Sequence, residues 1–177
     1  MLTAVPEVVG VDKSEAAVEA ARTRGVDARV ADLQDLPFAD GEFDIGMCNH
    51  VLYHLPNRHR GIAELARVLR PGGRFVGIYN YMDHLREIWD TVGDPWRDQP
   101  GWGCEDAQEL QSHFSRVECR ETEGQVVWLT RGDLQAYLDA YAEMIGELTA
   151  PEGAYPFVAR RHNCVLVAEK ESVRVGP

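Results

Sequence analysis

Short apolar runs alternate with helical patterns along the chain, as expected for a parallel sheet covered by helices. Three apolar, largely β-branched runs predict strands near residues 7–11, 26–31 and 43–48. Between the first two, an Ala-rich stretch with Ser14 as N-cap and Gly25 after its last turn predicts a helix. The pattern therefore predicts an α/β fold.

The pattern continues in the rest of the chain. Apolar residues at i, i+3, i+4 and i+7 predict an amphipathic helix over 58–70, and Pro71 with the glycines after it predicts a sharp reversal. Residues 117–129 are expected to be one hairpin or one bent strand around Gly124. The other expected elements are strands at 74–79 and 163–168, a helix through Ala107, Leu110 and Phe114, and a long helix over 134–148 capped by Thr130.

Periodicity is lost between Asp83 and Cys104, where Trp89, Trp96 and Trp102 alternate with prolines. Two interpretations of 83–104 stand side by side: an insertion that covers a substrate, or an irregular loop whose tryptophans anchor it to the core. No repeat, low-complexity tract or linker interrupts the chain elsewhere. We therefore expect residues 1–177 to form a single domain.

Composition and charge limit the classes of partner. The net charge of −11 argues against broad binding to nucleic acid or anionic lipid, and no apolar run approaches the roughly 20 residues of a membrane span. The first five residues lack the pattern of a signal peptide. Four widely spaced cysteines without a CxxC pair are expected to be free thiols. These features predict a cytoplasmic protein with a small-molecule partner.

Acidic residues follow the first two expected strands. Asp12 ends the first and Asp32 ends the second. In open parallel sheets, ligands bind outside the carboxyl ends of the strands, so both residues should lie on one rim with residues 48–54. A carboxylate there can accept hydrogen bonds from both hydroxyls of a ribose. From spacing alone, a turn or helix-capping acid is an equally good interpretation of Asp12.

Four segments together resemble the class I S-adenosylmethionine-dependent methyltransferases, in particular their type 11 branch. Residues 8–14 resemble the second strand and its acidic loop, and residues 32–44 resemble the segment that crosses the adenine pocket. Residues 49–55 resemble the motif after strand four, and residues 64–75 resemble the helix, turn and strand that follow. The resemblance implies a Rossmann-like, mostly parallel sheet and an enzyme that transfers a methyl group from S-adenosylmethionine to a small molecule.

The resemblance also implies cofactor contacts. Asp12 would accept from the ribose hydroxyls, and Lys13 would flank the adenine. Asp32 would accept from the adenine amine, and the main-chain amide of Leu33 would bind a ring nitrogen. These four residues form the expected adenosine half of the site.

Asn49 and two histidines follow the expected third strand. By resemblance, Asn49 would contact the methionine part of the cofactor through its main chain, while His50 and His54 would line the wall toward the transferred methyl. The histidines are four residues apart and could share a metal, but the Glu of an HExxH motif is absent, so no metal site is predicted. His54 is the candidate general base, and a packed histidine is the alternative; the catalytic residue itself is not identified.

The resemblance also implies a glycine-rich loop about 20 residues before the ribose acid, since in the family a helix and a strand fit between them. Only eleven residues precede Asp12, and Gly10 is the one glycine among them. We therefore expect weak or lost cofactor binding. We also expect a gap in the middle of the sheet, between the strands that end at Asp12 and near Cys48.

Three outcomes would fill that gap. The two strands pair directly, a second copy completes the sheet as a homodimer, or the true gene product is longer. The favoured interpretation is an N-terminally truncated chain, with dimerisation as the rescue. The alternative function is a non-catalytic methyltransferase-fold remnant that acts as an interaction or regulatory protein. A nicotinamide dehydrogenase ranks below both, because residues 32–44 do not fit it.

Overall fold

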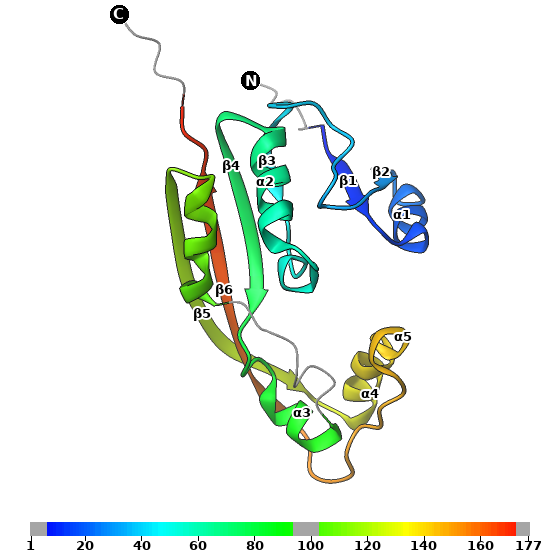
Figure 1. The fold of residues 1–177 in the computed structure, drawn as a ribbon. Coiled ribbons are helices and arrows are strands. Elements are labelled where there is room, and N and C mark those ends of the chain that lie inside the picture. The colour runs from blue at the N-terminus through cyan, green and yellow to red at the C-terminus, as the bar shows by residue number, and fades with distance from the viewer. Residues whose placement is uncertain (1–6, 94–102, 173–177) are drawn as a thin grey trace, which may run out of the picture.

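The computed structural model describes residues 7–93 and 103–172 (Figure 1). Its first elements follow the predicted order. They are β1 (Val9–Asp12), α1 (Glu15–Arg22), β2 (Asp27–Val30), β3 (Phe43–Met47), a 3-10 helix η1 (Leu52–His54), α2 (Arg58–Val68) and β4 (Leu69–Asn80). They are followed by α3 (Arg86–Val92), a 3-10 helix η2 (Cys104–Ser112), β5 (Arg116–Trp128), α4 (Arg131–Asp139), α5 (Ala142–Ile145) and β6 (Phe157–Glu169). The α/β prediction is confirmed.

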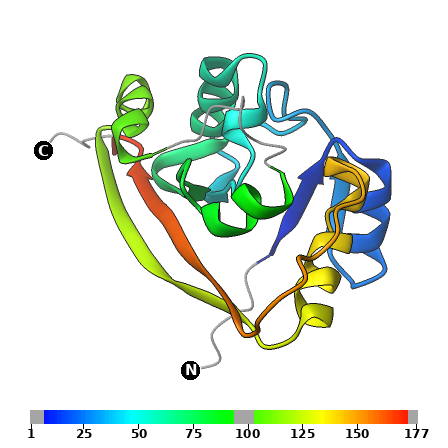
Figure 2. The ribbon, with the colours of Figure 1, turned by 90° about the horizontal axis from the view of Figure 1, so that it is seen from below.

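The described strands form two separate sheets. β1 and β2 pair in parallel, while the larger sheet has the order β3-β4-β6-β5. β3 and β4 are parallel, and β6 runs antiparallel to both of its neighbours. Within residues 7–93 and 103–172, β1 does not pair with β3, and the two sheets lie apart in both Figure 1 and Figure 2. The predicted gap between these strands is therefore present.

The main core lies on one face of the larger sheet. α2 and η2 cover this face, and their apolar residues pack against alternate residues of β4 and β6. Ile62 and Leu110 come from the two helices, and Phe75 and Leu166 from the strands; all four are fully buried. The buried Tyr79 hydroxyl donates to the Cys48 carbonyl at 2.6 Å, which ties β4 to the end of β3.

A second core lies at the far end of β5 and β6, where α3 and α4 pack against the two strands. β5 is one continuous, bent strand, and Figure 2 shows it beside β6 along its length. Leu134 and Leu138 of α4 are fully buried, as the apolar stripe predicts. Trp89 of α3 is 8% exposed in this core, which supports the anchoring interpretation for that residue. Trp96 and Trp102 fall outside the described residues.

Three expected elements differ from the structure. The reversal expected after α2 lies inside β4 as an irregularity in register, where Gly72 has a φ of +74° and Leu69 and Arg74 pair with Phe43 and Ile45. The helix expected through Leu110 is the 3-10 helix η2. The long helix over 134–148 breaks into α4 and α5. Gly146, with a φ of +81°, ends α5 and lets the chain fold back toward α4.

The expectation that all four cysteines are free is wrong. Cys104 and Cys119 form a disulfide, while Cys48 and Cys164 are free and buried. The fold places the first residue of η2 beside β5, with the two Cα atoms 5.5 Å apart. The separation of 15 residues in sequence does not reveal this proximity. Among the described residues, no helix is long and apolar enough to cross a membrane.

Candidate cofactor site

Asp12 lies exposed at the carboxyl end of β1, where α1 begins. One carboxylate oxygen accepts from the main-chain nitrogen of Ser14 at 2.8 Å, and the Ser14 hydroxyl caps α1 by accepting from Ala17 at 3.2 Å. The Asp12 carbonyl accepts from the nitrogen of Ala31 at 3.0 Å, which holds the ends of β1 and β2 together. Both interpretations of Asp12 are therefore compatible: it orders the turn with one oxygen, and it stands exposed on the rim.

Asp32 follows β2 and lies beside Lys13, the residue after Asp12. Its carboxylate is 2.9 Å from the ammonium of Lys13 and accepts from the main-chain nitrogen of Gln34 at 2.9 Å. These two interactions lower the pKa of Asp32 to about 2. Both side chains are partly exposed, so the ion pair adds little stability. Its importance is that Asp32 stays an ionised hydrogen-bond acceptor.

The loop that carries Leu33 is fixed by its side chain and by Gln34. The Leu33 side chain is half-buried against the main core, near Leu55 and Gly61. Within the described part of the chain, the Leu33 amide makes no hydrogen bond to the protein. The Gln34 side-chain nitrogen donates to the Asp32 carboxylate at 3.3 Å. Its side-chain oxygen accepts from the main-chain nitrogen of Asn57, the N-cap of α2, at 3.0 Å. This residue links the loop after β2 to α2.

Two residues that sequence reasoning missed hold the rest of this loop. Glu64 on α2 accepts from the nitrogen of Leu36 at 2.8 Å, and Arg67 donates to the carbonyl oxygens of Leu36 and Phe38 at 2.9 and 2.7 Å. Glu64 and Arg67 are themselves paired at 2.7 Å. Their i, i+3 spacing gives a shared helix face, but only the structure reveals that this face binds the loop.

Asn49 and His50 lie where β3 ends beside β4. The Asn49 side-chain oxygen accepts from the nitrogen of Ile78 at 3.1 Å, and the His50 nitrogen donates to the Ile78 carbonyl at 2.9 Å. His50 has a φ of +56°, an uncommon left-handed conformation that turns the chain toward η1. Desolvation, and then the positive charge of a protonated His54, lower the pKa of His50. His54 ends η1 and is exposed, with its ring 4.4 Å from that of Tyr53.

The predicted residues thus form two groups. Asp12, Lys13, Asp32 and Leu33 gather at the ends of β1 and β2, while Asn49, His50 and His54 gather at the end of β3. Side-chain contacts from α2 connect the groups through the loop after β2.

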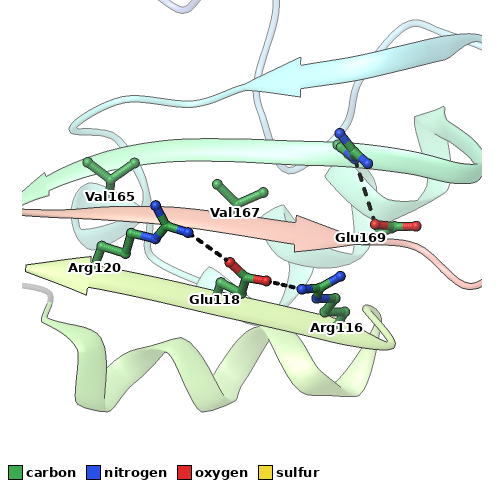
Figure 3. A pocket seen from close by; sticks show the side chains of 7 residues that line it. Arg116, Glu118, Arg120, Val165, Val167 and Glu169 are labelled. Carbon is green, nitrogen blue, oxygen red and sulfur yellow. Dashed lines mark ion pairs between the residues drawn. The ribbon is translucent and has the colours of Figure 1, made fainter.

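A hollow of about 360 Å³ lies elsewhere, on the face of the larger sheet opposite the main core (Figure 3). Val165 and Val167 form its floor, and they alternate along β6 with the core residue Leu166. Three arginines at its edge are paired with glutamates: Arg116 and Arg120 with Glu118, and Arg74 with Glu169. None of the predicted cofactor residues lines this hollow.

Residues 1–77 match the family described as methyltransferase domain. Over 77 residues the chain is 44% identical to 27-O-demethylrifamycin SV methyltransferase from Amycolatopsis mediterranei, covering 39% of this chain and 28% of the relative. It is 32% identical over 84 residues to the uncharacterized methyltransferase YcgJ from Bacillus subtilis, covering 44% of this chain and 33% of that protein. The chain therefore spans about a third of the length of each of these relatives.

The likeness to solved structures extends over nearly all of the chain. A putative methyltransferase from Bacillus halodurans superimposes with a TM-score of 0.61 at 18% identity, covering 94% of this chain and 84% of that one. The YcgJ structure gives a TM-score of 0.59 at 17% identity, covering 94% of this chain and 83% of that one. At these identities the comparison establishes the fold, which is Rossmann-like.

Proposed function

We propose that this protein binds S-adenosylmethionine and methylates a small molecule, because residues 1–77 match the methyltransferase domain family and the fold is that of the class I S-adenosylmethionine-dependent methyltransferases. The observation that carries the proposal is the pair of rim carboxylates. Asp12 ends β1, and Asp32 follows the end of the parallel neighbour β2. The 3.0 Å hydrogen bond from the Ala31 nitrogen to the Asp12 carbonyl holds the two strand ends together.

The described residues fit the adenosine part of that cofactor. Asp12 offers an exposed carboxylate to two ribose hydroxyls, and a carboxylate can accept from both. Asp32 is held ionised by Gln34 and Lys13, so it can accept from an exocyclic amine. The Leu33 amide, unpaired within the described residues, can donate to a ring nitrogen. The Leu33 amide as donor, the Asp32 carboxylate as acceptor and the Asp12 carboxylate for the ribose thus lie at the same edge of the small sheet.

The cofactor, when bound, supplies an electrophilic methyl group on a sulfonium. The residues of this chain then have two tasks, orientation and exclusion of water. Asn49 and His50 would hold the part of the cofactor beyond the ribose from the end of β3, where hydrogen bonds to Ile78 fix both residues. His54 stays a candidate base toward the substrate.

Calorimetric titration with S-adenosylhomocysteine tests the proposal. We expect binding that is saturable but weak, as the sequence predicts. Asp32→Asn or Asp12→Asn should weaken it further, about tenfold or more, because each variant loses charge-assisted hydrogen bonds. Asp27→Asn is the matched control: it removes an exposed carboxylate from the opposite end of β2, so its Kd should equal that of the wild type. Absence of saturable binding, or equal weakening by Asp27→Asn, contradicts the proposal.

The partner that we propose is a second copy of the chain, seated at the edge of β3. β3 is the first strand of the larger sheet, and it exposes 60% of Ile45 and 67% of Met47. An exposed apolar edge strand readily pairs with another strand. Sedimentation velocity should therefore detect a dimer that Ile45→Lys dissociates. Val8→Lys is the control, since Val8 is 64% exposed but lies outside the larger sheet. A wild-type chain that sediments only as a monomer contradicts this proposal.

A further inference from the structure

The loop after β4 and strand β6 together hold an Asp–His pair, separate from the rim carboxylates. One oxygen of Asp83 lies 2.6 Å from Nδ1 of His162, and the other lies 2.5 Å from Nη1 of Arg160. Antiparallel pairing of β4 with β6 brings these residues together, since Asn80 pairs with Asn163. The residues of the pair are 79 positions apart, so the arrangement is a product of the fold.

Asp83 and Tyr81 hold the ring of His162, and two further contacts fix its main chain. The Tyr81 ring stacks on the His162 ring with centroids 4.0 Å apart and planes at 14°. The Tyr81 nitrogen donates to the His162 carbonyl at 3.2 Å, and Nδ1 of His84 lies 3.1 Å from the His162 nitrogen. A carboxylate accepts only, so in the neutral ring Asp83 requires the proton on Nδ1. Nε2 then carries the lone pair.

That Nε2 atom is buried and unsatisfied. His162 is 9% exposed, and no hydrogen-bond partner for its Nε2 exists in the described residues. Native proteins pair nearly all of their buried polar groups, because an unpaired acceptor loses its hydration without compensation. A ring that is oriented by a carboxylate and lacks a partner on its other nitrogen has the arrangement of a general base before its substrate arrives.

The pair lies near the second group of predicted cofactor residues. Asp83 follows the carboxyl end of β4, and β4 is hydrogen-bonded to Asn49 and His50 through Ile78. His84 is next to Asp83. Desolvation is the main reason why the pKa of His84 is lowered, and a positive charge on the nearby His50 lowers it further. The segment therefore lies near Asn49 and His50, which in the proposed function hold the part of the cofactor beyond the ribose.

We propose that His162, oriented by Asp83, is the base that deprotonates a hydroxyl-bearing acceptor, an inference that rests on the proposed function. Nε2 of His162 takes the proton as the O–H bond breaks, and the electron pair left on oxygen forms the bond to the methyl carbon. The methyl–sulfur bond breaks at the same time, and its electron pair returns to sulfur. Asp83 stabilises the imidazolium that results. A phenol is the favoured acceptor, because its hydroxyl, with a pKa near the value of about 10 for tyrosine, gives up a proton to an imidazole more readily than an alcohol does.

The tautomer of His162 provides a first test that needs no activity. Two-bond ¹H–¹⁵N correlation spectra of the wild-type protein at pH 8 should give His162 a protonated Nδ1 and an unprotonated Nε2. Asp83→Asn should move the proton to Nε2, because the amide can donate to Nδ1. His113→Gln, a change at an exposed histidine, should leave the His162 signals unchanged. A protonated Nε2 in the wild type overturns the proposal.

The second test uses phenol and anisole, two probes that differ in the O–H group. In the presence of S-adenosylhomocysteine, phenol should shift the Nε2 resonance of His162 saturably, and anisole should not. Equal responses, or no response to phenol, overturn the inference. If S-adenosylhomocysteine binds but phenol gives no response, the base is wrong and the proposed function stands. If S-adenosylhomocysteine does not bind, the proposed function fails. The tautomer of His162, and the shift that phenol causes in the absence of S-adenosylhomocysteine, still decide whether His162 can act as a base.

Discussion

Arg67→Ala should release the loop that carries Asp32 and Leu33 from α2. The Arg67 guanidinium donates to both carboxylate oxygens of Glu64, at 2.7 and 2.8 Å, and to the carbonyl oxygens of Leu36 and Phe38. Its remaining contact is with an aspartate, Asp40, whose side chain is 82% exposed. Alanine removes every one of these hydrogen bonds, and it leaves the Glu64 carboxylate with only the Leu36 nitrogen as a donor.

The expected loss is about 3.5 kcal/mol of unfolding free energy. Each bond to a neutral carbonyl contributes about 1 kcal/mol and the charged pair about 1.5–3 kcal/mol. We take the low end for the pair, because the Arg67 side chain is 30% exposed and solvent screens it. The contact with Asp40 is counted as nothing, since it is almost fully in water. At roughly 2–4 °C per kcal/mol for a chain of this size, Tm should fall by about 7–14 °C.

Urea unfolding followed by tryptophan fluorescence measures this difference. Arg60→Ala is the matched control: Arg60 is exposed on the same helix, and within the described residues its side chain makes no ion pair. Its unfolding free energy should stay within about 0.5 kcal/mol of the wild type. A loss below 1 kcal/mol for Arg67→Ala, or equal losses for both variants, would refute the role assigned to Arg67.

Three further predictions concern acid, glycine and the disulfide. The pKa of Asp32 is lowered to about 2, so its stabilising effect is present above the unfolded pKa of about 3.9 and is lost as the pH falls toward 2. In urea titrations, the difference in unfolding free energy between the wild type and Asp32→Asn should therefore shrink over that interval, and a pH-independent difference contradicts this. Gly77→Ala places a Cβ 2.6 Å from the buried Tyr79 ring and should lower the unfolding free energy in urea by about 1–3 kcal/mol. The control Gly132→Ala lies in α4 and should raise the unfolding free energy by up to about 1 kcal/mol, and equal effects of the two variants would show that the core adapts. Cys104→Ser should lower the unfolding free energy by about 3 kcal/mol, because the disulfide closes a loop of 15 residues and so constrains the unfolded chain. Thiol titration of the unfolded, unreduced wild type should detect two thiols, and four would disprove the disulfide.

Local signals account for the part of the fold that sequence predicts well. The Ser14 cap, the β-branched residues of β1 and the final turn at Gly25 all act within a few residues, and the structure has β1, α1 and β2 where these signals indicate. The same local logic places Asp12 and Asp32 at adjacent strand ends. α4 starts directly after its N-cap Thr130 for a similar local reason, because Thr130 and Asp133 form a reciprocal cap.

Non-local contacts account for what sequence could not predict. The disulfide joins η2 to β5 across 15 residues, and the Asp83–His162 pair spans 79. Neither has a periodic or motif signal, because the disulfide depends on how η2 lies beside β5, and the Asp83–His162 pair depends on the register between β4 and β6. The break between α4 and α5 is non-local too: Gln135 of α4 donates to Leu148 and accepts from Ala150 after the chain has folded back.

The relation between the two sheets gives the α2 contacts their importance. Because β1 and β3 do not pair within the described residues, strand pairing does not set the distance between the rim carboxylates and Asn49. That distance depends instead on contacts between the loop after β2 and α2. The side chains of Gln34, Glu64 and Arg67 make most of them, and one main-chain hydrogen bond from Gly41 to Arg67 adds to them. Breaking them would leave each sheet intact while the two groups of cofactor residues separate. A variant such as Arg67→Ala should therefore weaken S-adenosylhomocysteine binding at urea concentrations where the protein is still folded.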